Sequence, residues 1–389
     1  MTARTLVDFT HEKGKDKIED SANHIIGAKH DNNNSVNETK NKETFKMEIV
    51  WKNVILFATM HVVYVYGILL LLRGQCTIGT FIFNYLYGIY GGLSVTIGAH
   101  RLWAHRAYSA TLPFRIFLMI GHTIAIQNDL YIWTRDHRVH HKFTDLNADP
   151  HNSKRGFFFS HMGWLMLKKH PDVMEKGKLV DMSDLLQDPV VRFQRKYYIP
   201  LVFILSIALP IFVTHYFFEQ TIWTSILAVN FRLLTSLHIT WLVNSGAHMW
   251  GMKPYDKSIN PTDHKTIAWM TMGEGWHNYH HVFPWDYKAA ELGNYKYNFS
   301  TFLLDCAGKL GLAYNFKTAS DEMIKKRVLR TGDPLLWSTL SKDSELKFET
   351  DMKAHHREEQ IWGWGDKDMK KDEIMEVKRS CKQKVSPST

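Results

Sequence analysis

Cysteine is scarce in this chain of 389 residues. Only Cys76, Cys306 and Cys381 are present, and they lie far apart. An odd and scattered set excludes a disulfide framework and the paired cysteines of a zinc site. The chain also lacks the Gly-x-Gly-x-x-Gly fingerprint of a dinucleotide-binding domain, the His-Pro-Gly-Gly core of a fused haem domain and any basic–aromatic motif for nucleic acid. We therefore expect no nucleic-acid partner and no redox cofactor of those two kinds within the chain.

Charge and hydrophobicity are unevenly distributed along the sequence. Lysine and arginine number 48 against 39 acidic residues, which gives 48 − 39 = +9 with neutral histidine. Residues 1–46 and 334–389 are polar and charged, so we expect tails on either side of one domain, 47–333. Inside that domain lie four apolar runs of roughly 20 residues, the length that a helix needs to cross a bilayer core. These predicted spans are residues 54–72, 77–99, 198–218 and 222–243.

The predicted spans form two pairs, each joined by only a few residues. Links this short allow only tight hairpins, so the three long segments outside the spans must share one side of the membrane. Those segments are residues 1–50, 100–197 and 244–389, and they hold nearly all of the lysine and arginine. The positive-inside rule then places them, and both chain ends, in the cytosol.

A fifth apolar stretch, residues 112–133, is interrupted by Arg115, His122 and Asp129. We expect it to lie at the membrane surface or beneath the cytosolic segments, and not to span. The predicted fold is therefore an all-α membrane protein with four transmembrane helices in two hairpins.

Histidine is abundant, with 22 residues, and nine of them fall in short motifs outside the predicted spans. One motif is H-x4-H, directly after the second span. Two are H-x2-H-H, and a ninth histidine follows the fourth span. In chain order they are His100 and His105; His137, His140 and His141; His248; and His277, His280 and His281.

The spacing of these histidines favours metal binding. Residues i, i+3 and i+4 share one face of a helix, so each H-x2-H-H motif is expected to present three imidazoles on one side. His100 and His105 lie about 140° apart on an ideal helix, so they converge only if the helix ends or distorts, or if the metals lie on different sides of it. Imidazole suits iron, copper, nickel and zinc, and eight or nine ligands exceed one tetrahedral site. We predict two metal ions, each with an open position.

The order and surroundings of the motifs resemble one family. Over roughly residues 48–333 the chain is similar to the membrane fatty acyl-CoA desaturases of the stearoyl-CoA desaturase type. The matching segments are Gly98–His105, Trp133–Phe143, Asp149–Asn152, Gly156–Trp164, Trp241–His248 and Gly273–Trp285. Gly293–Tyr295, Arg330–Asp333 and Trp362–Asp366 resemble the insect branch, moths in particular. That likeness suggests a role in unsaturated fatty acid or sex pheromone biosynthesis.

The resemblance implies a four-span protein of the endoplasmic reticulum membrane, with a cytosolic helical cap that carries a di-iron centre. It implies insertion of a double bond into a saturated or monounsaturated fatty acyl-CoA. Molecular oxygen would be reduced to water, and cytochrome b5 with its reductase would supply the electrons. The implied iron ligands are the nine motif histidines, and Asn244 matches a family position that reaches one iron through water.

The resemblance also indicates residues for the substrate. The candidates for binding coenzyme A are Lys52, Asn53, Asn128, Arg135, Asp136, Lys168 and Lys169. For the first two, anchoring at the membrane interface is the alternative, and for Arg135 and Asp136 it is support of a metal ligand. Trp133, Trp241 and His238 are candidates for lining an acyl tunnel, with ordinary packing as the alternative.

Three features depart from the family pattern. His238 stands where asparagine is common, Asn260–Asp263 matches no common insect subclass, and residues 335–360 look inserted. These departures affect substrate preference and double-bond position, and not the type of chemistry.

Three other functions were weighed against the desaturase. A membrane fatty acid hydroxylase or alkane monooxygenase uses the same kind of metal site, although the motif spacing and the Trp241–His248 segment favour a desaturase. A metal transporter would place its ligands within the spans. A non-catalytic lipid-binding relative would be expected to have lost a ligand, and all nine histidines are present.

Overall fold

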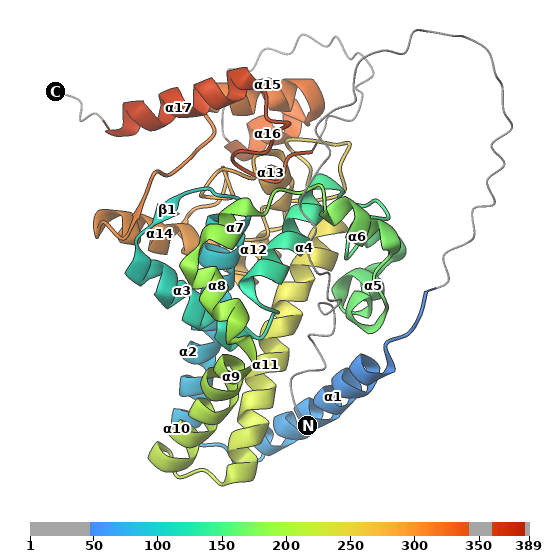
Figure 1. The fold of residues 1–389 in the computed structure, drawn as a ribbon, viewed down its shortest axis with the longest axis vertical. Coiled ribbons are helices and arrows are strands. Elements are labelled where there is room, and N and C mark those ends of the chain that lie inside the picture. Colours follow the sequence, from blue (N-terminus) through green and yellow to red (C-terminus); the bar gives the residue numbers. More distant parts are fainter. Residues whose placement is uncertain (1–46, 342–359, 386–389) are drawn as a thin grey trace, which may run out of the picture.

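The computed structural model describes residues 47–341 and 360–385, with side chains described as far as Arg379. Within these ranges the chain is mostly helical (Figure 1). One small sheet pairs β1 (Ser109–Ala110) with β2 (Ala313–Tyr314) in antiparallel register, with Ser109 opposite Tyr314.

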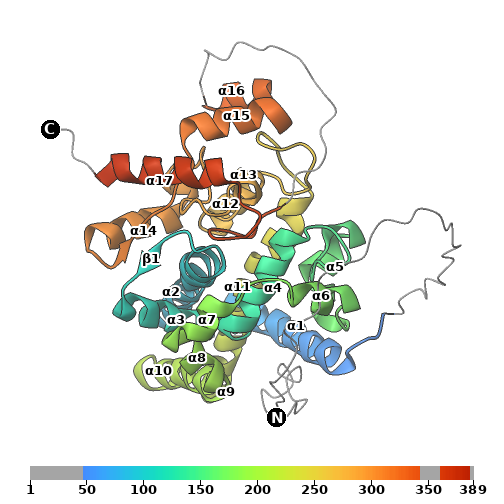
Figure 2. The same ribbon diagram turned by 45° about the horizontal axis from the view of Figure 1, so that its top comes forward.

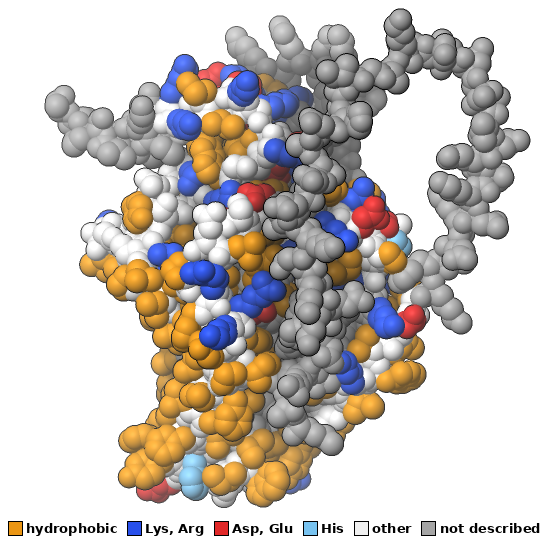
Figure 3. Space-filling view, viewed as in Figure 1, with side chains coloured by type: hydrophobic (Ala, Val, Ile, Leu, Met, Phe, Trp, Pro, Cys, Tyr) orange, Lys and Arg blue, Asp and Glu red, His pale blue; other side chains and the backbone are white. Residues whose placement is uncertain are grey.

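Among the described residues, three helical segments are long and apolar enough to cross a membrane. They are α1 (Trp51–Leu72), the run Tyr198–Phe217 and the run Ile222–His248. They agree closely with the first, third and fourth predicted spans. The long helix α11 (Ile222–Ser245) packs against α1 on one side and against α10 (Leu209–Phe217) on another. On the face in Figure 3, hydrophobic side chains cover the lower part of the molecule, where these helices lie, and lysine and arginine gather higher up.

The second predicted span forms α2 (Ile78–Ser94), which continues without a break into a π-helix, η2 (Val95–Ala104). This helical run is not among the three segments above because Thr80, Asn84 and several glycines lower its hydropathy. The fifth apolar stretch forms α3 (Leu112–Ala125), which is too short to count as a span and packs against α2. The prediction that it does not span is consistent with this length.

The remaining helices form the upper part of the molecule in Figure 1 and the connection to α10. They are α4 (Leu130–Lys142), η3 (Ser153–Arg155), α5 (Phe157–His161), η4 (Gly163–Met166), α6 (Pro171–Gly177), α7 (Ser183–Gln187), α8 (Pro189–Lys196), α9 (Tyr198–Leu201), the π-helix η5 (Val202–Ala208), η6 (Gly246–His248), α12 (Lys265–Met270), α13 (His277–Val282), η7 (Tyr295–Tyr297), α14 (Phe299–Lys309), α15 (Asp321–Thr331), α16 (Pro334–Ser341) and α17 (Lys371–Val385).

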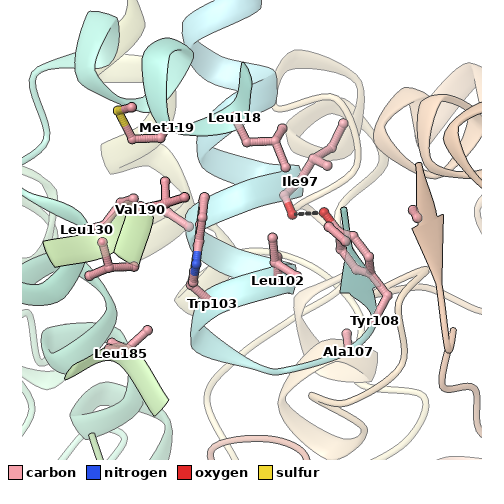
Figure 4. Close-up of a cluster of buried hydrophobic side chains, with 14 of the residues drawn as sticks. Ile97, Leu102, Trp103, Ala107, Tyr108, Leu118, Met119, Leu130, Leu185 and Val190 are labelled. Carbon is pink, nitrogen blue, oxygen red and sulfur yellow. Dashed lines mark hydrogen bonds between the residues drawn. The ribbon is translucent and has the colours of Figure 1, made fainter. Parts of the chain in front are cut away.

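A hydrophobic core surrounds η2 and holds it in place. Figure 4 shows Trp103 beside Leu130 and Val190, while Tyr108 on the other side donates a hydrogen bond to the Ile97 carbonyl over 2.8 Å. Burying each large apolar side chain contributes roughly 1.5–3 kcal/mol. The π-helix that carries the H-x4-H motif is therefore fixed by packing on both flanks.

A second core lies around α13, α15 and α16, and the C-terminal segment completes it. Ile361, Met369 and Val377 are buried there with Trp337 and Tyr279. The sequence analysis placed residues 334–389 in a charged tail. The described part of that range is instead folded onto the domain, because a few large apolar residues among the charges bury enough surface to hold it.

Candidate metal centre

The nine motif histidines meet in two adjacent clusters. The first, the five-histidine cluster, consists of His100, His105, His137, His141 and His280. The second, the four-histidine cluster, consists of His140, His248, His277 and His281. Within each cluster the ligand nitrogens lie within 4.8 Å of one another. The structure thus brings together every histidine that the motifs singled out.

The ring nitrogens in each cluster point toward a common centre. The Nε2–Nε2 separations are 2.8 Å for His100–His280, 2.9 Å for His105–His137, and 3.1 Å for His141–His280, His248–His277 and His277–His281. Two nitrogens bound at right angles to one metal, each through a bond of about 2.0–2.1 Å, would lie about 3.0 Å apart. The donor set therefore fits one metal ion in each cluster.

The π-helix η2 explains how His100 and His105 reach the same cluster. The backbone N–H of His105 donates to the carbonyl of His100 over 3.1 Å, which is an i→i−5 bond. A π-helix has a wider turn than an α-helix, so residue i+5 points much more nearly in the direction of residue i. The two rings lie 4.7 Å apart between centroids. Of the conditions that the sequence left open, helix distortion is the one that the structure shows.

Each H-x2-H-H motif serves both clusters. On α4, His137 and His141 belong to the five-histidine cluster and the intervening His140 belongs to the other. On α13 the assignment is reversed, because His277 and His281 belong to the four-histidine cluster and His280 to the other. The sequence predicted three imidazoles on one face. The structure places that face between the two clusters, so that the i and i+4 residues belong to one cluster and the i+3 residue belongs to the other.

Burial keeps the imidazoles in the form that binds metal. Burial first, and neighbouring histidines second, lower the pKa well below the usual value for seven of them: His105, His137, His141, His248, His277, His280 and His281. A histidine must be neutral to donate a lone pair to a metal. The clusters are therefore electrically suited to cations.

Two carboxylates orient ligand histidines from behind, and the sequence analysis did not identify either in this role. An oxygen of Glu274 lies 2.8 Å from His100 Nδ1, and Asp149 Oδ1 lies 2.9 Å from His140 Nδ1. A carboxylate at Nδ1 fixes the tautomer and leaves Nε2 free for metal. The only available signal was position, since Asp149 and Glu274 lie close to the motifs in sequence.

Glu274 is itself held by a buried arginine. Arg101 donates to Glu274 Oε1 over 2.9 Å and to Thr301 over 3.0 Å, and its side chain is almost completely buried. Burial alone would raise the pKa of Glu274, but His100 and Arg101 outweigh it and lower that pKa to about 2. Glu274 is therefore a permanent carboxylate at this site.

An apolar cavity of about 770 Å³ leads away from the clusters. His100, His137, His140 and His277 form one end of its wall, with Trp133. From there it follows α2 and α11, past Thr96, Gly92, Gly88, Asn84 and Thr80, to Leu70 and Leu71 of α1. Its volume lies within the range of about 300–1,000 Å³ that is usual for sites of small organic molecules. The polar and glycine residues that make α2 less hydrophobic thus face this cavity.

Asn244 also lines the cavity, one helical turn before His248 on α11. Of the three residues predicted to line a tunnel, Trp133 is in the cavity wall. The described wall includes neither Trp241 nor His238, which pack toward α1 and α5 instead.

The residues predicted to bind coenzyme A gather at the start of α1 and at the outer side of α4. Asp136 pairs with Arg135 over 2.9 Å and also with Lys169. Asn53 donates to the carbonyl of Leu165 over 2.7 Å, which joins the start of α1 to the same segment. Burial would raise the pKa of Asp136, but Lys169 and Arg135 outweigh it and lower the pKa.

The other candidates for coenzyme A take different positions. Exposed Lys168 pairs with Glu48 over 2.5 Å. Lys52 lies in the first turn of α1, and Asn128, in a left-handed conformation, precedes α4. Six of the seven candidates thus come together as a group, and Asn128 lies apart from them, just before α4 begins.

The structure combines apolar helices with two buried histidine clusters and an apolar cavity between helices. This combination defines a class of membrane protein in which paired metal sites lie at one end of a cavity for a hydrophobic molecule. The chain belongs to the fatty acid desaturase family, since the family pattern matches residues 77–290, more than half of its length.

Individual relatives support the same assignment. An acyl-CoA Delta-9 desaturase of Acheta domesticus is 49% identical over 343 residues, covering 88% of this chain and 89% of the relative. An acyl-CoA Delta12-desaturase of the same species is 48% identical, covering 86% and 87%. The stearoyl-CoA desaturase of Bos taurus is 50% identical, covering 74% and 80%.

Proposed function

We propose that the protein is an acyl-CoA desaturase. It would remove two hydrogens from adjacent carbons of a fatty acyl chain and form a double bond between them. The balanced reaction consumes one O2, two electrons and two protons and releases two waters. The observation that carries this proposal is the pair of all-histidine clusters at one end of an apolar cavity, in a chain of this family.

The clusters fit two iron ions. Five imidazoles surround one position and four surround the other, and Asn244, which shares the cavity wall with His140 and His277, would reach the second through water. Bound iron would supply the activation of O2. The protein's own contribution is orientation, because Glu274 and Asp149 fix the tautomers of two ligands.

The cavity supports binding of a long apolar chain. Its wall is mainly hydrophobic, so it would exclude water from the reacting carbons. Coenzyme A would bind outside, at Lys52, Asn53, Asn128, Arg135, Asp136, Lys168 and Lys169. Arginine and lysine are suited to its phosphates. From there the acyl chain would pass Trp133 and the clusters, and its methyl end would lie along α2 and α11.

The fourth membrane span of the proposal is α2. The polar residues that lower its hydropathy face the cavity and not the lipid, which is compatible with a spanning helix. With α2 included, the helices form two hairpins, and the helices that carry the histidines form a cap on one side. The distribution of lysine and arginine supports a cytosolic cap and cytosolic chain ends, in the endoplasmic reticulum membrane.

Electrons would come from another protein, with cytochrome b5 and its reductase as the proposed source. The chain lacks the dinucleotide and haem motifs named above. Lysine and arginine on the upper surface would favour an acidic partner. Overall identity does not assign the double-bond position, because relatives named for positions 9 and 12 are almost equally similar.

A fatty acid hydroxylase is the second candidate, because it would use the same kind of metal site. The relatives named as desaturases favour the first candidate. A transporter is less well supported, since the cluster histidines lie on η2 or directly after it, on α4 and α13 or, for His248, at the last residue of an apolar segment, and not in the middle of the three apolar segments.

Expression in a desaturase-deficient yeast would test the proposal. Wild type, His140→Ala and the control His215→Ala would be compared, with double bonds located by mass spectrometry. His215 lies near the end of α10 and bonds the Gln220 carbonyl, outside both clusters. A new unsaturated acid from wild type and His215→Ala only is the expected result. A hydroxy acid would support the second candidate, and unsaturated product from His140→Ala would contradict the proposed site.

A further inference from the structure

The segment before α17 returns to the metal centre from the far end of the chain. We call residues 360–370 the strap. In Figures 1 and 2 the dark red loop before α17 lies beside α13. Hydrogen bonds place it against the five-histidine cluster, as the next paragraphs describe. The strap is not part of any of the three helical segments that are long and apolar enough to span a membrane.

The strap bonds one ligand histidine twice. The carbonyl oxygen of Trp362 lies 2.5 Å from His105 Nδ1, and the backbone N–H of Trp364 donates to the His105 carbonyl over 2.9 Å. His105 is completely buried, with its Nε2 atom 2.9 Å from that of His137. A carbonyl can only accept, so His105 must carry its proton on Nδ1. Its Nε2 lone pair is then directed into the cluster.

Charged residues around the cluster hold the strap in place. The Trp362 ring lies 4.1 Å from the Arg138 guanidinium and 4.8 Å from that of Arg106, which gives cation–π contacts on a buried ring. Asp366 accepts from the Trp362 N–H over 2.9 Å and from Lys142 Nζ over 3.1 Å. Lys142 ends α4, the helix that carries His137 and His141. The strap is therefore tied to a ligand-bearing helix as well as to His105.

The strap approaches His105 so closely that one position admits only glycine. Gly363 has φ +154, and a Cβ atom there would lie 2.6 Å from the His105 carbonyl oxygen. Real Cβ atoms do not come so close, and backbone cannot move aside as a flexible side chain can. The strap therefore packs directly against the His105 backbone and is not a loose tail.

The groups that orient the ligand histidines differ in how close they lie, in sequence, to the histidine motifs. Glu274 and Asp149, which orient His100 and His140, lie near the motifs in the chain. Trp362, the partner of His105, lies on the strap, well beyond the last histidine motif in the sequence. We propose that the strap is a positioning element of the five-histidine cluster, so that metal retention there depends on its docking. This inference rests on the proposed metal binding and adds to it a part of the chain outside the family match, residues 77–290.

Metal analysis of purified full-length protein would test this proposal. The variants are Gly363→Ala, which blocks the junction, and Gly311→Ala as the matched control. Gly311 also has a positive φ, +70, but nothing lies within 4 Å of its Cβ position. We expect about two iron atoms per chain in wild type and Gly311→Ala, and about one in Gly363→Ala. Loss of a partner that orients a ligand typically weakens metal affinity 10–100-fold.

Two milder substitutions test the proposal if the Gly363→Ala protein fails to fold. Trp362→Phe keeps the carbonyl and an aromatic ring, while Asp366→Asn weakens the tie to Lys142. Iron release to a chelator is expected to be near wild type in Trp362→Phe and at least about tenfold faster in Asp366→Asn. Wild-type release rates in both Gly363→Ala and Asp366→Asn, with two irons bound, would overturn the strap proposal and leave the proposed function intact. Wild type without iron would overturn the proposed function itself.

Discussion

His61 of α1 and His238 of α11 contact each other through their Nε2 atoms at 3.1 Å. The series of hydrogen bonds extends beyond this pair at both ends. His238 Nδ1 lies 3.0 Å from His161 Nε2, and His61 Nδ1 lies 2.6 Å from the Phe57 carbonyl oxygen. Because that carbonyl can only accept, it fixes the direction of the donors. His61 donates to Phe57, His238 donates to His61, and His161 donates to His238.

This network predicts coupling between α1 and α11. His61→Leu leaves His238 without its acceptor, so the single change is expected to destabilise the protein by about 1–3 kcal/mol. The double change to Leu at positions 61 and 238 should cost less than the sum, with a coupling of about 0.6 kcal/mol, as is typical between membrane helices. Thermal unfolding of the four proteins in detergent measures this cycle. Strict additivity would show that the contact adds nothing.

A second prediction concerns pH and Asp184. Burial would raise the pKa of Asp184, but hydrogen bonds from Arg106 and Arg138 outweigh it and lower the pKa to about 2. A carboxylate with a lowered pKa stabilises the fold above its unfolded-state pKa, and this contribution is lost as pH falls toward 2. Asp184→Asn should therefore cost about 2 kcal/mol at pH 7 and at pH 5.5 alike. The difference should shrink only below about pH 4.

Unfolding of wild type and Asp184→Asn across this pH range is the measurement. Asp181→Asn is the control, since Asp181 is more exposed and its nearest arginine contact is longer, 3.2 Å to Arg106. Exposed pairs contribute little. A stability difference for Asp184→Asn that already disappears between pH 7 and 5.5 would contradict the assigned direction of the pKa shift.

Two adjacent residues of α13 should bind different metal ions. His280 belongs to the five-histidine cluster and His281 to the four-histidine cluster. His280→Ala and His281→Ala should each lower the iron content from about two to about one per chain, and the double variant should retain almost none. Iron analysis together with Mössbauer spectra of the singly depleted proteins would show two different remaining sites. Identical spectra for both single variants would contradict the division of the motif between clusters.

Gly88 should limit the length of the acyl chain. It lines the cavity on α2, twelve residues before His100. A leucine there would fill the cavity far from the clusters, and its Cβ would lie 3.2 Å from Arg232 Cγ, the middle of a flexible side chain. Gly88→Leu is therefore expected to lower kcat/KM for the longest substrates by roughly tenfold or more and to spare shorter ones.

Product profiles from yeast fed acids of increasing length would measure this preference. Ile82→Phe is the control, because Ile82 is about half exposed on the same helix and does not belong to the described cavity wall. An unchanged product profile in Gly88→Leu would show that the acyl chain does not follow α2.

The membrane helices and the membership of the metal centre could be predicted from the sequence. Apolar runs predicted the ends of three spans to within five residues, and histidine spacing identified eight cluster members, to which His248 was added from its position after the fourth span. The arrangement within the centre could not be predicted. Whether the helix at His100 turns as α or π depends on the packing of residues such as Trp103 and Tyr108 against other elements. The division of each H-x2-H-H motif depends on where α4 and α13 lie relative to each other.

The role of the C-terminal segment could not be predicted either. Trp362 and Val377 lie among a few other apolar residues in a charged stretch, and the local sequence does not reveal their partners. His105 and Trp362 are separated by 257 residues, so their contact follows only from the complete fold. Glu274 and Arg101 are similar, since each lies inside a motif that already had an interpretation through its histidines.

The position of the strap in the chain has a consequence for biosynthesis. All nine cluster histidines and their carboxylate partners precede residue 282, whereas Trp362 is synthesised after all of them. With synthesis at about 5–20 residues per second, the nascent protein spends several seconds with its ligands assembled and this side of the five-histidine cluster uncovered. Metal loading therefore has a natural interval during translation, and the arrival of the strap ends it.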